Sequence, residues 1–367
     1  MQLTRQQVIA HRVAAQGLLR DGSSIDELAV LDFGVQDTSG SARLAFDARV
    51  RRPVAPPDTL ARTATVWTLR GAPHVHRRRD LNGLAAALWP LSDADALARM
   101  QASAPLRKAG IGGLDGFTTA LAALCNIVTA PMDKGSVSTA LTKATPDGLH
   151  RHCRACQATH VYEIVLRFPT LAAGLELEPG TSPPVLVPRA KAVVPDAVDV
   201  DALQELVRTY LRLLGPGTDA DVADYLGARR ADLAKVWPDD LVEVGVEGRT
   251  AWLPDDAVAK ARRPRKPRLT RLLGAFDPYL QARDRDLIVP DKAVQKTLWP
   301  ILGRPGVVFV NGEVVGTWRP KSAKTRLQLN VETFAPLPPA IRREVEAEAE
   351  RVGTARDATD VDVRWVD

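Results

Sequence analysis

Residues 203–252 contain the feature that most restricts the fold of this chain, a series of short helical segments that ends in a hairpin. A turn of Gly215, Pro216 and Gly217 separates the first two helical segments, and Gly227 ends the second as glycine commonly does. Three helices followed by a two-stranded hairpin define a winged helix-turn-helix. The predicted helices span 203–214, 219–226 and 231–237, and the predicted hairpin spans 242–252.

The rest of the chain also alternates short helical and strand patterns. Asn311 and Gly312 lie between two runs of alternating β-branched residues, which predicts a hairpin with a type I′ turn over 307–318. The mixture of segments predicts an α+β fold. Further strands are predicted within 64–76, after His150 and at 326–331, and further helices at 4–20, 41–50, 80–91, 114–128, 135–145 and 339–353.

Composition excludes several classes of protein. The 367 residues are 45% apolar and 25% charged, which is typical of globular proteins and sufficient for two or three domains. No apolar run is long enough to cross a bilayer, and the first residues contain no hydrophobic signal core. Three cysteines cannot form a disulfide framework, so we expect free or metal-bound thiols, a cytoplasmic location and no membrane partner.

Positive charge is concentrated at residues 257–276, which we name the basic strip. The strip has seven cationic residues and no acidic residue; since the whole chain carries +5, the remainder carries −2. Such a strip is suited to phosphate contacts with nucleic acid, although a solvated linker broken by Pro264 and Pro267 has the same pattern. Its cations are Lys260, Arg262, Arg263, Arg265, Lys266, Arg268 and Arg271.

A second basic cluster follows the predicted Asn311-Gly312 hairpin. It consists of Arg319, Lys321, Lys324 and Arg326, between the hairpin and the next predicted strand. A hairpin with basic flanks can lie along a DNA groove. A sheet edge protected by lysine and arginine has the same sequence, so both interpretations stay open.

Five segments of the chain resemble a known family. They are GVQDTSGSARLAFDARV, LRGAPHV, LGPGTDADVADYLG, LLGAFDPYL and FVNGEVVGTW. In this order they resemble the bacterial winged-helix DNA-binding-domain family that includes the crosslink-unhooking DNA glycosylases of the AlkZ/YcaQ type. The resemblance implies tandem winged-helix units, three in number, around a concave basic cleft that fits duplex DNA. The expected division is 1–105 with a candidate active loop, 106–200 as a second winged helix, 201–256 as a third, and 257–367 with the basic strip and the hairpin.

The resemblance also implies a candidate active loop. The family's glycosylases carry a motif of glutamine, hydrophobic residue and glutamine, which corresponds here to Gly34, Val35 and Gln36. The second glutamine is retained and the first is replaced by Gly34, which cannot position a water. Asp37 is the candidate to supply a carboxylate in its place. Without the family, Gln36 and Asp37 are equally well read as part of a turn and helix cap before Gly40.

Two further residues are candidates for DNA contact. Arg70 lies in the segment that matches the family's LRG motif, and His74 follows it closely. The resemblance implies that both face the cleft. The alternative for His74 is a hydrogen-bonded histidine on the face of a strand.

A cluster of cysteine and histidine residues lies at 150–160. Cys153 and Cys156 have the CxxC spacing that lets two thiolates bind one tetrahedral zinc ion, and His160 is the candidate third ligand. His152 and the remote Cys125 are candidates to complete the set. The alternative is a pair of unliganded thiols beside exposed histidines. No cofactor is expected to be required, and any zinc is expected to stabilise a strand or wing.

Two functions fit these observations. The first is a DNA glycosylase that excises bulky or crosslinked N-alkylpurines from duplex DNA by water-mediated hydrolysis, as a monomer. The second is a non-catalytic DNA-binding protein of the same architecture, a lesion sensor or transcriptional regulator, which the replaced glutamine favours. A protein-interaction scaffold ranks last, because it would leave the basic strip without phosphates to contact.

Overall fold

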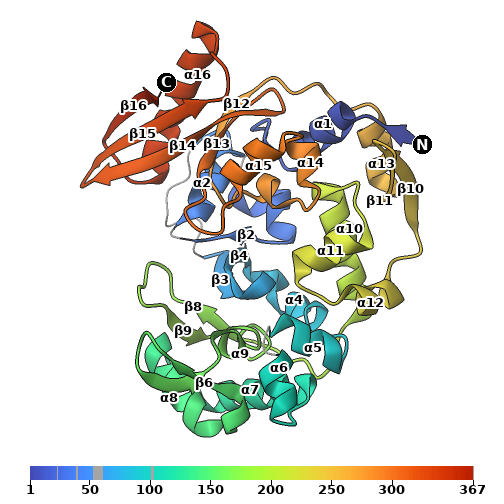
Figure 1. Ribbon diagram of the computed structural model, residues 1–367, viewed down its shortest axis with the longest axis vertical. Helices are drawn as coiled ribbons and strands as arrows, with labels where there is room; N and C mark the ends of the chain where they lie inside the picture. The colour runs from blue at the N-terminus through green and yellow to red at the C-terminus, as the bar shows by residue number, and fades with distance from the viewer. Residues whose placement is uncertain (23, 39, 53–60, 101–102, 367) are drawn as a thin grey trace. The chain divides into compact units, whose positions relative to one another are not determined.

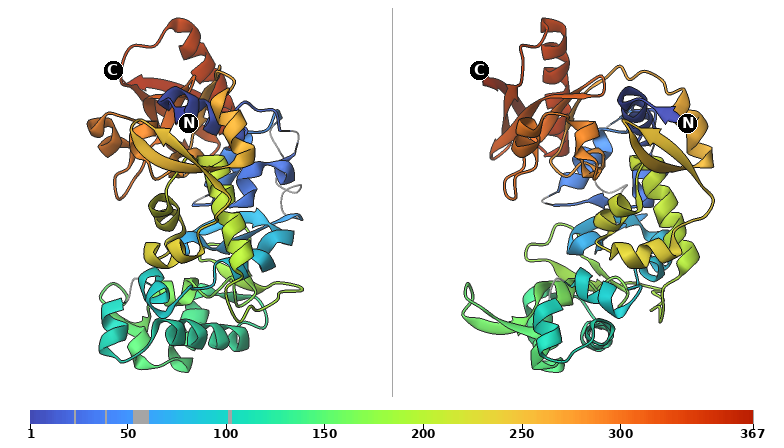
Figure 2. Two further views of the ribbon diagram at one scale, coloured as in Figure 1. Left: turned by 90° about the vertical axis from the view of Figure 1, so that its right-hand side faces the viewer. Right: turned by 45° about the vertical axis from the view of Figure 1, so that its right-hand side comes forward.

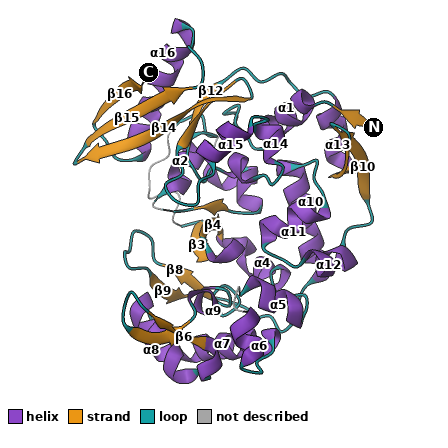
Figure 3. Ribbon diagram, viewed as in Figure 1, coloured by secondary structure: helices purple, strands orange, loops and turns teal. Residues whose placement is uncertain are grey.

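The computed structural model describes residues 1–22, 24–38, 40–52, 61–100 and 103–366 (Figure 1). Ser39, part of the turn predicted before Gly40, lies outside these residues. Helices and strands alternate along the chain (Figure 3), which confirms the α+β prediction. The chain forms two compact units: unit 1 consists of Met1–Ala61, Arg208–Thr218 and Asp239–Asp367, and unit 2 of Arg62–Val207 and Asp219–Pro238.

A five-stranded sheet forms the carboxy-terminal part of unit 1. The predicted hairpin occurs with Asn311 and Gly312 at φ angles of 52° and 100°, as a type I′ turn requires. The last two strands pair in parallel, which the sequence prediction missed. In spatial order the strands are β12 (Thr270–Leu273), β13 (Gly306–Val310), β14 (Glu313–Ala323), β15 (Arg326–Thr333) and β16 (Asp360–Val366).

Helix α16 (Pro339–Ala355) connects the two parallel strands and packs on the sheet (Figure 2). Its buried Val345, Ala349 and Val352 contact a cluster that includes Leu329 and Trp318. A parallel pair needs such a crossover, so the helix that the sequence predicts at 339–353 also explains the strand that it did not predict.

The amino-terminal part of unit 1 begins with β1 (Gln2–Leu3) and α1 (Arg5–Ala15). Thr4 caps α1 by a capping box with Gln7. Strand β1 pairs with the hairpin β10 (Leu241–Val246) and β11 (Arg249–Pro254), and α1 packs on α13 (Asp255–Arg262). The other elements of unit 1 are β2 (Val35–Gln36), α2 (Ser41–Asp47), α14 (Arg285–Ile288), α15 (Lys292–Leu298) and the 3₁₀ turns Ile25–Glu27, Ala29–Asp32 and Pro278–Gln281.

Buried ion pairs join segments of unit 1 that are distant in sequence. Arg49 donates two hydrogen bonds of 2.8 Å each to the carboxylate of Asp277, and both side chains are at most 1% exposed. Arg12 binds Asp284 in the same two-pronged manner and also donates to the carbonyl oxygen of Gly215. These pairs therefore connect all three stretches of chain that form unit 1.

Unit 2 is a sheet covered by helices. Its core includes Trp67, Phe117, Leu124, Val165 and Leu175. Five strands pair in the order β4 (Pro73–Arg77), β3 (Thr63–Trp67), β8 (Leu175–Leu177), β9 (Val185–Pro188) and β5 (Met132–Asp133), and β6 (His150–Cys153) pairs with β7 (Ala158–Val161) as a separate hairpin. The helices are α4 (Leu81–Ala87), α5 (Asp93–Arg99), α6 (Ser103–Lys108), α7 (Gly113–Ile127), α8 (Lys134–Ala144) and α9 (Glu163–Arg167), with 3₁₀ turns at Leu69–Gly71, Arg78–Asp80 and Asp147–Leu149.

The segments of the predicted winged helix occur in the predicted order. They are α10 (Val200–Leu214), α11 (Asp219–Leu226), α12 (Arg230–Leu233) with the 3₁₀ turn Ala234–Val236, and the hairpin β10–β11. By their contacts α11 and α12 belong to unit 2 and the hairpin to unit 1. The four consecutive segments expected from the sequence stay a prediction. Among the described residues, no helix combines the length and the apolar character that a membrane span requires.

We predict that Asp277→Asn destabilises the protein by about 3–5 kcal/mol, because the buried Arg49 guanidinium loses its countercharge. The asparagine oxygen still accepts the Tyr279 N–H hydrogen bond, so the change isolates the charge. Urea unfolding measures the free energy. The matched control is Asp240→Asn, which breaks the exposed Arg208–Asp240 pair and should cost about 1 kcal/mol or less. Equal losses in the two variants would contradict the prediction.

Candidate functional site

The loop that carries Gln36 is closed by hydrogen bonds to its own side chains. The Nε2 amide of Gln36 donates to Thr38 Oγ1 over 2.9 Å, so the side chain is held over the loop. The Ser41 hydroxyl donates to the Gln36 carbonyl oxygen and accepts from the Thr38 N–H. The half-buried Gln36 is therefore fixed at the amino terminus of α2, where N–H groups favour anionic partners.

Asp37 caps helix α2. Its Oδ1 accepts the N–H of Ala42, in the first turn of the helix, over 3.0 Å, while Gly40 occupies the N-cap position. Burial raises the pKa of Asp37, and the hydrogen bond from Ala42 opposes this only in part. A carboxyl group with a raised pKa beside Gln36 is also suited to accepting a proton from water.

Gly34 precedes β2 with a left-handed backbone, at a φ of 92°. L-residues rarely adopt this conformation, so a glutamine at this position would be strained. The replacement of the family's first glutamine thus coincides with a local backbone that favours glycine.

Arg70 is partly buried in unit 2. Its Nη1 donates a short hydrogen bond to the Tyr225 carbonyl oxygen, and its guanidinium lies 5.5 Å from the centre of the Tyr225 ring. Arg70 also lines a cavity of about 290 Å³ together with Trp67, Arg99 and Phe168. These contacts fix the side chain, whereas its predicted contact with DNA stays a prediction.

His74 differs from its predicted place in an open cleft. It lies on β4 and is 3% exposed, with Nδ1 3.0 Å from the Ala72 carbonyl oxygen. Burial lowers the pKa of His74 to about 4, so the ring is neutral at pH 7. A neutral and enclosed ring offers no cation to a phosphate, so we assign His74 a packing role, the alternative that the sequence left open.

The basic strip is mostly exposed. Helix α13 extends into it as far as Arg262, and the chain beyond Pro264 continues to β12 without a helix. Arg271 is the exception: it is 8% exposed, and its Nη1 donates to the Thr270 carbonyl oxygen. Six cations of the strip, Lys260, Arg262, Arg263, Arg265, Lys266 and Arg268, face solvent and are available to a polyanion.

The cations after the Asn311-Gly312 hairpin lie at the far end of β14 and β15 (Figure 1). Arg319, Lys321 and Lys324 are exposed, and Lys324 forms the tight turn with a φ of 55°. Arg319 Nη1 donates to the Gly303 carbonyl oxygen, and Arg326 pairs with Asp360 on β16. The ends of these two inner strands of the five-stranded sheet thus carry exposed cations, and a role of these cations in DNA binding stays a prediction.

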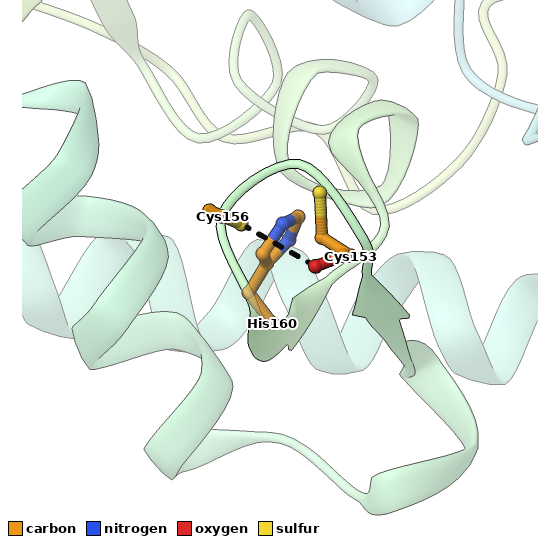
Figure 4. Close-up of side chains that lie close together, drawn as sticks. All are labelled: Cys153, Cys156 and His160. Atoms are coloured by element: carbon orange, nitrogen blue, oxygen red, sulfur yellow. Dashed lines mark hydrogen bonds between the residues drawn. The ribbon is translucent and has the colours of Figure 1, made fainter.

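The candidate metal ligands meet at the end of the β6–β7 hairpin (Figure 4). One ligand atom each from Cys153, Cys156 and His160 lies within 4.8 Å of the others. His152 does not join them, because it precedes Cys153 on the same strand and faces the opposite side of the hairpin. The three residues that meet are the ones predicted as ligands, and the further candidate His152 is not among them.

Comparison with known proteins supports one family. The family model described as "DNA glycosylase AlkZ-like" matches residues 34–355. This chain belongs to the AlkZ-like DNA glycosylase family. The resemblance found in the sequence is thereby confirmed. Streptomyces sahachiroi DNA glycosylase AlkZ has a similar fold, with a TM-score of 0.76, 21% identity and coverage of 100% of both chains. A search of curated proteins gave no significant match.

Sequence reasoning missed the residues that hold the candidate active loop. Thr38 and Ser41 bind the side chain and the backbone of Gln36, and Arg49 holds the other end of α2 through Ala45 and Asp277. Serine and threonine close to a predicted helix start are a usable signal for the first two. Arg49 carries no such signal, because its partner is 228 residues away.

We predict that His74 makes the protein sensitive to acid. Because the pKa is 6.5 in an unfolded chain and about 4 in the fold, unfolding takes up a proton between these values, and stability is lost as pH falls from 6.5 towards 4. The loss approaches about 3 kcal/mol for this residue. Urea unfolding at pH 7, 6, 5 and 4.5 should show a smaller pH dependence in His74→Phe than in the wild type. An unchanged dependence would exclude His74 as a source.

Proposed function

We propose that this protein is a monofunctional DNA glycosylase that excises bulky or crosslinked N-alkylpurines from duplex DNA. The proposal rests above all on the family match over 34–355. It is supported by the fixed Gln36 beside a carboxyl group of raised pKa, and by the exposed basic strip. The proposed architecture is the one that the resemblance implies, with three winged-helix units around a basic concave surface. The protein is proposed to act on DNA in repair, as a monomer.

The proposed reaction is hydrolysis of the glycosidic bond. An alkyl group on N7 makes the purine cationic, so the C1′–N9 bond is already weak, and its electron pair returns to N9 as the bond breaks. A water held by Gln36 adds to C1′ and gives its proton to the Asp37 carboxylate. The same carboxylate stabilises the positive charge that develops on the sugar. The products are the free neutral alkylpurine and an abasic site.

A second candidate is a non-catalytic DNA-binding protein of the same architecture. Two observations favour it: Gly34 replaces the family's first glutamine, and the Asp37 carboxylate already caps α2. In that case Gln36 and Asp37 are turn residues, and the protein senses lesions or regulates transcription without excising bases.

We predict that Asp37→Asn lowers the single-turnover rate of base release from duplex DNA with N7-alkylguanine by at least about a hundredfold. Asparagine keeps the acceptor for the Ala42 N–H, so the cap and the thermal stability should be retained. Gln36→Ala should lower the rate as well. The control for it is Gln328→Ala, another half-buried glutamine of unit 1 whose Nε2 donates to a single side chain.

The pH dependence of the base-release rate tests whether Asp37 acts in catalysis or is only a turn residue. Since burial raises the pKa of Asp37, the wild-type rate should fall on the acid side at a pH above the usual range of an aspartate, and Asp37→Asn should lack this limb. Asp21→Asn, at an exposed carboxylate of unit 1, should behave as the wild type. Duplex binding without base release in the wild type would refute the glycosylase and leave the second candidate.

We predict that reversing two charges of the basic strip, Arg263→Glu with Arg265→Glu, weakens duplex binding at least about tenfold, whatever the DNA sequence, and flattens its salt dependence. The wild type should lose about a thousandfold in affinity between 50 and 200 mM salt if six or more phosphates are bound. Lys296→Glu with Arg343→Glu changes the net charge equally at exposed helix positions and is the control. Equal effects of the two pairs would remove the strip from the interface.

A further inference from the structure

The β6–β7 hairpin of unit 2 gathers two thiols and one imidazole at one end. Cys153 ends β6, Cys156 lies in the four-residue turn, and His160 lies on β7 on the same face of the hairpin as Cys153. Their three ligand atoms lie within 4.8 Å of one another. In a tetrahedral zinc site two sulfurs are about 3.8 Å apart, given Zn–S bonds of about 2.3 Å. The ligand atoms can move from within 4.8 Å of one another to this spacing by small rotations of side chains in an exposed turn.

His160 presents one particular nitrogen to the thiols. Its Nδ1 lies 2.8 Å from the Val161 carbonyl oxygen and can reach it only as a donor. In the neutral ring Nε2 is then the unprotonated nitrogen, with its lone pair available for a metal. A backbone carbonyl that fixes the tautomer in this way is typical of histidines that bind metals.

The turn also surrounds the sulfur of Cys153 with backbone amide groups. The backbone N–H groups of Cys156 and Ala155 direct hydrogen bonds to its sulfur. Gln157 follows with a φ of 51°, which reverses the chain after Cys156 and allows the turn to wrap around the sulfur. Amide groups around a sulfur stabilise the negative charge of a thiolate, which is the form of cysteine that binds a metal ion.

We propose that this hairpin binds one Zn²⁺ ion through Cys153 Sγ, Cys156 Sγ and His160 Nε2, with a water as the fourth ligand. Two thiolates balance the charge of the ion, and the imidazole is neutral. Both thiols lose their protons to solvent on binding, and no redox step is involved.

A metal ion at the turn would stabilise this exposed hairpin. Seven of the eight residues in β6 and β7 are exposed or only half-buried on a two-stranded sheet, and an isolated two-stranded sheet is marginally stable. Val161 at the base of the hairpin is buried and its N–H donates to Thr142 Oγ1, so this end of the hairpin is anchored. A metal ion at the turn holds the other end. A disulfide between the cysteines would also close the turn, but it would give His160 no role.

The test is a titration of the full-length, reduced protein with Co²⁺ and Zn²⁺ in the absence of oxygen. We expect one equivalent of Co²⁺ to give the visible absorption of a tetrahedral site together with thiolate-to-cobalt charge transfer, and one equivalent of Zn²⁺ to displace it. Cys153→Ser and Cys156→Ser should each lower the affinity at least about a hundredfold, and His160→Ala should lower it and change the visible bands. Hydrogen exchange at β6 and β7 should slow when Zn²⁺ is added.

The matched controls are His152→Ala, on the opposite face of the same hairpin, and Cys125→Ser, on α7; both should bind as the wild type does. Circular dichroism shows whether each variant is folded. The proposal is overturned if the reduced wild type binds less than one equivalent, if either hairpin cysteine variant binds Co²⁺ as tightly as the wild type, or if His152→Ala and His160→Ala have equal effects. None of these measurements uses base release, so the zinc site and the glycosylase can fail separately.

Discussion

The buried pair of Arg49 and Asp277 is the interaction on which unit 1 depends. Unit 1 is built from three stretches of chain, and hydrophobic contact alone does not fix how distant stretches meet. A two-pronged arginine–carboxylate pair has a single geometry, and its cost of burial is recovered only when both partners are in place. With the Arg12–Asp284 pair it specifies one arrangement of α1, α2 and the segment before α14. Segments of the family resemblance, one with Arg49 and one with Asp277, meet here.

The same pair also determines the position of the candidate active loop. Arg49 donates to the Ala45 carbonyl oxygen as well as to Asp277, so the carboxy-terminal end of α2 is fixed. The opposite end of this short helix bears the Asp37 cap and the loop of Gln36. A helix of seven residues is short enough to be nearly rigid. Fixing one end of α2 through the buried Arg49–Asp277 pair therefore also fixes the other end, next to the half-buried Gln36.

Local features were predictable from the sequence, and pairings between distant residues were not. Three of the predicted features depend only on residues close together in sequence. The structure has the turn at Asn311-Gly312, the cap at Thr4 and the cluster at the CxxC spacing. Strand β16 and the Arg49–Asp277 pair depend on partners that no local pattern identifies. His152 is a poor ligand beside Cys153 for an equally local reason, because neighbouring residues on a strand face opposite sides. The burial of His74 was not predictable, since an alternating strand does not show which face the rest of the chain covers.

Gly34 stands where the resemblance places the first glutamine of the motif, in the candidate active loop. At a φ of 92°, a side chain at this position would cost roughly 1–2 kcal/mol, so restoring the glutamine would strain the loop before adding any chemistry. The loss of that glutamine is therefore part of the backbone conformation and not an isolated exchange. What the loop retains is an amide fixed by Thr38 and a carboxyl group whose pKa burial has raised, both beside the amino terminus of α2. If this loop is catalytic, the acid–base chemistry has moved from the first position of the motif to the residue that follows it.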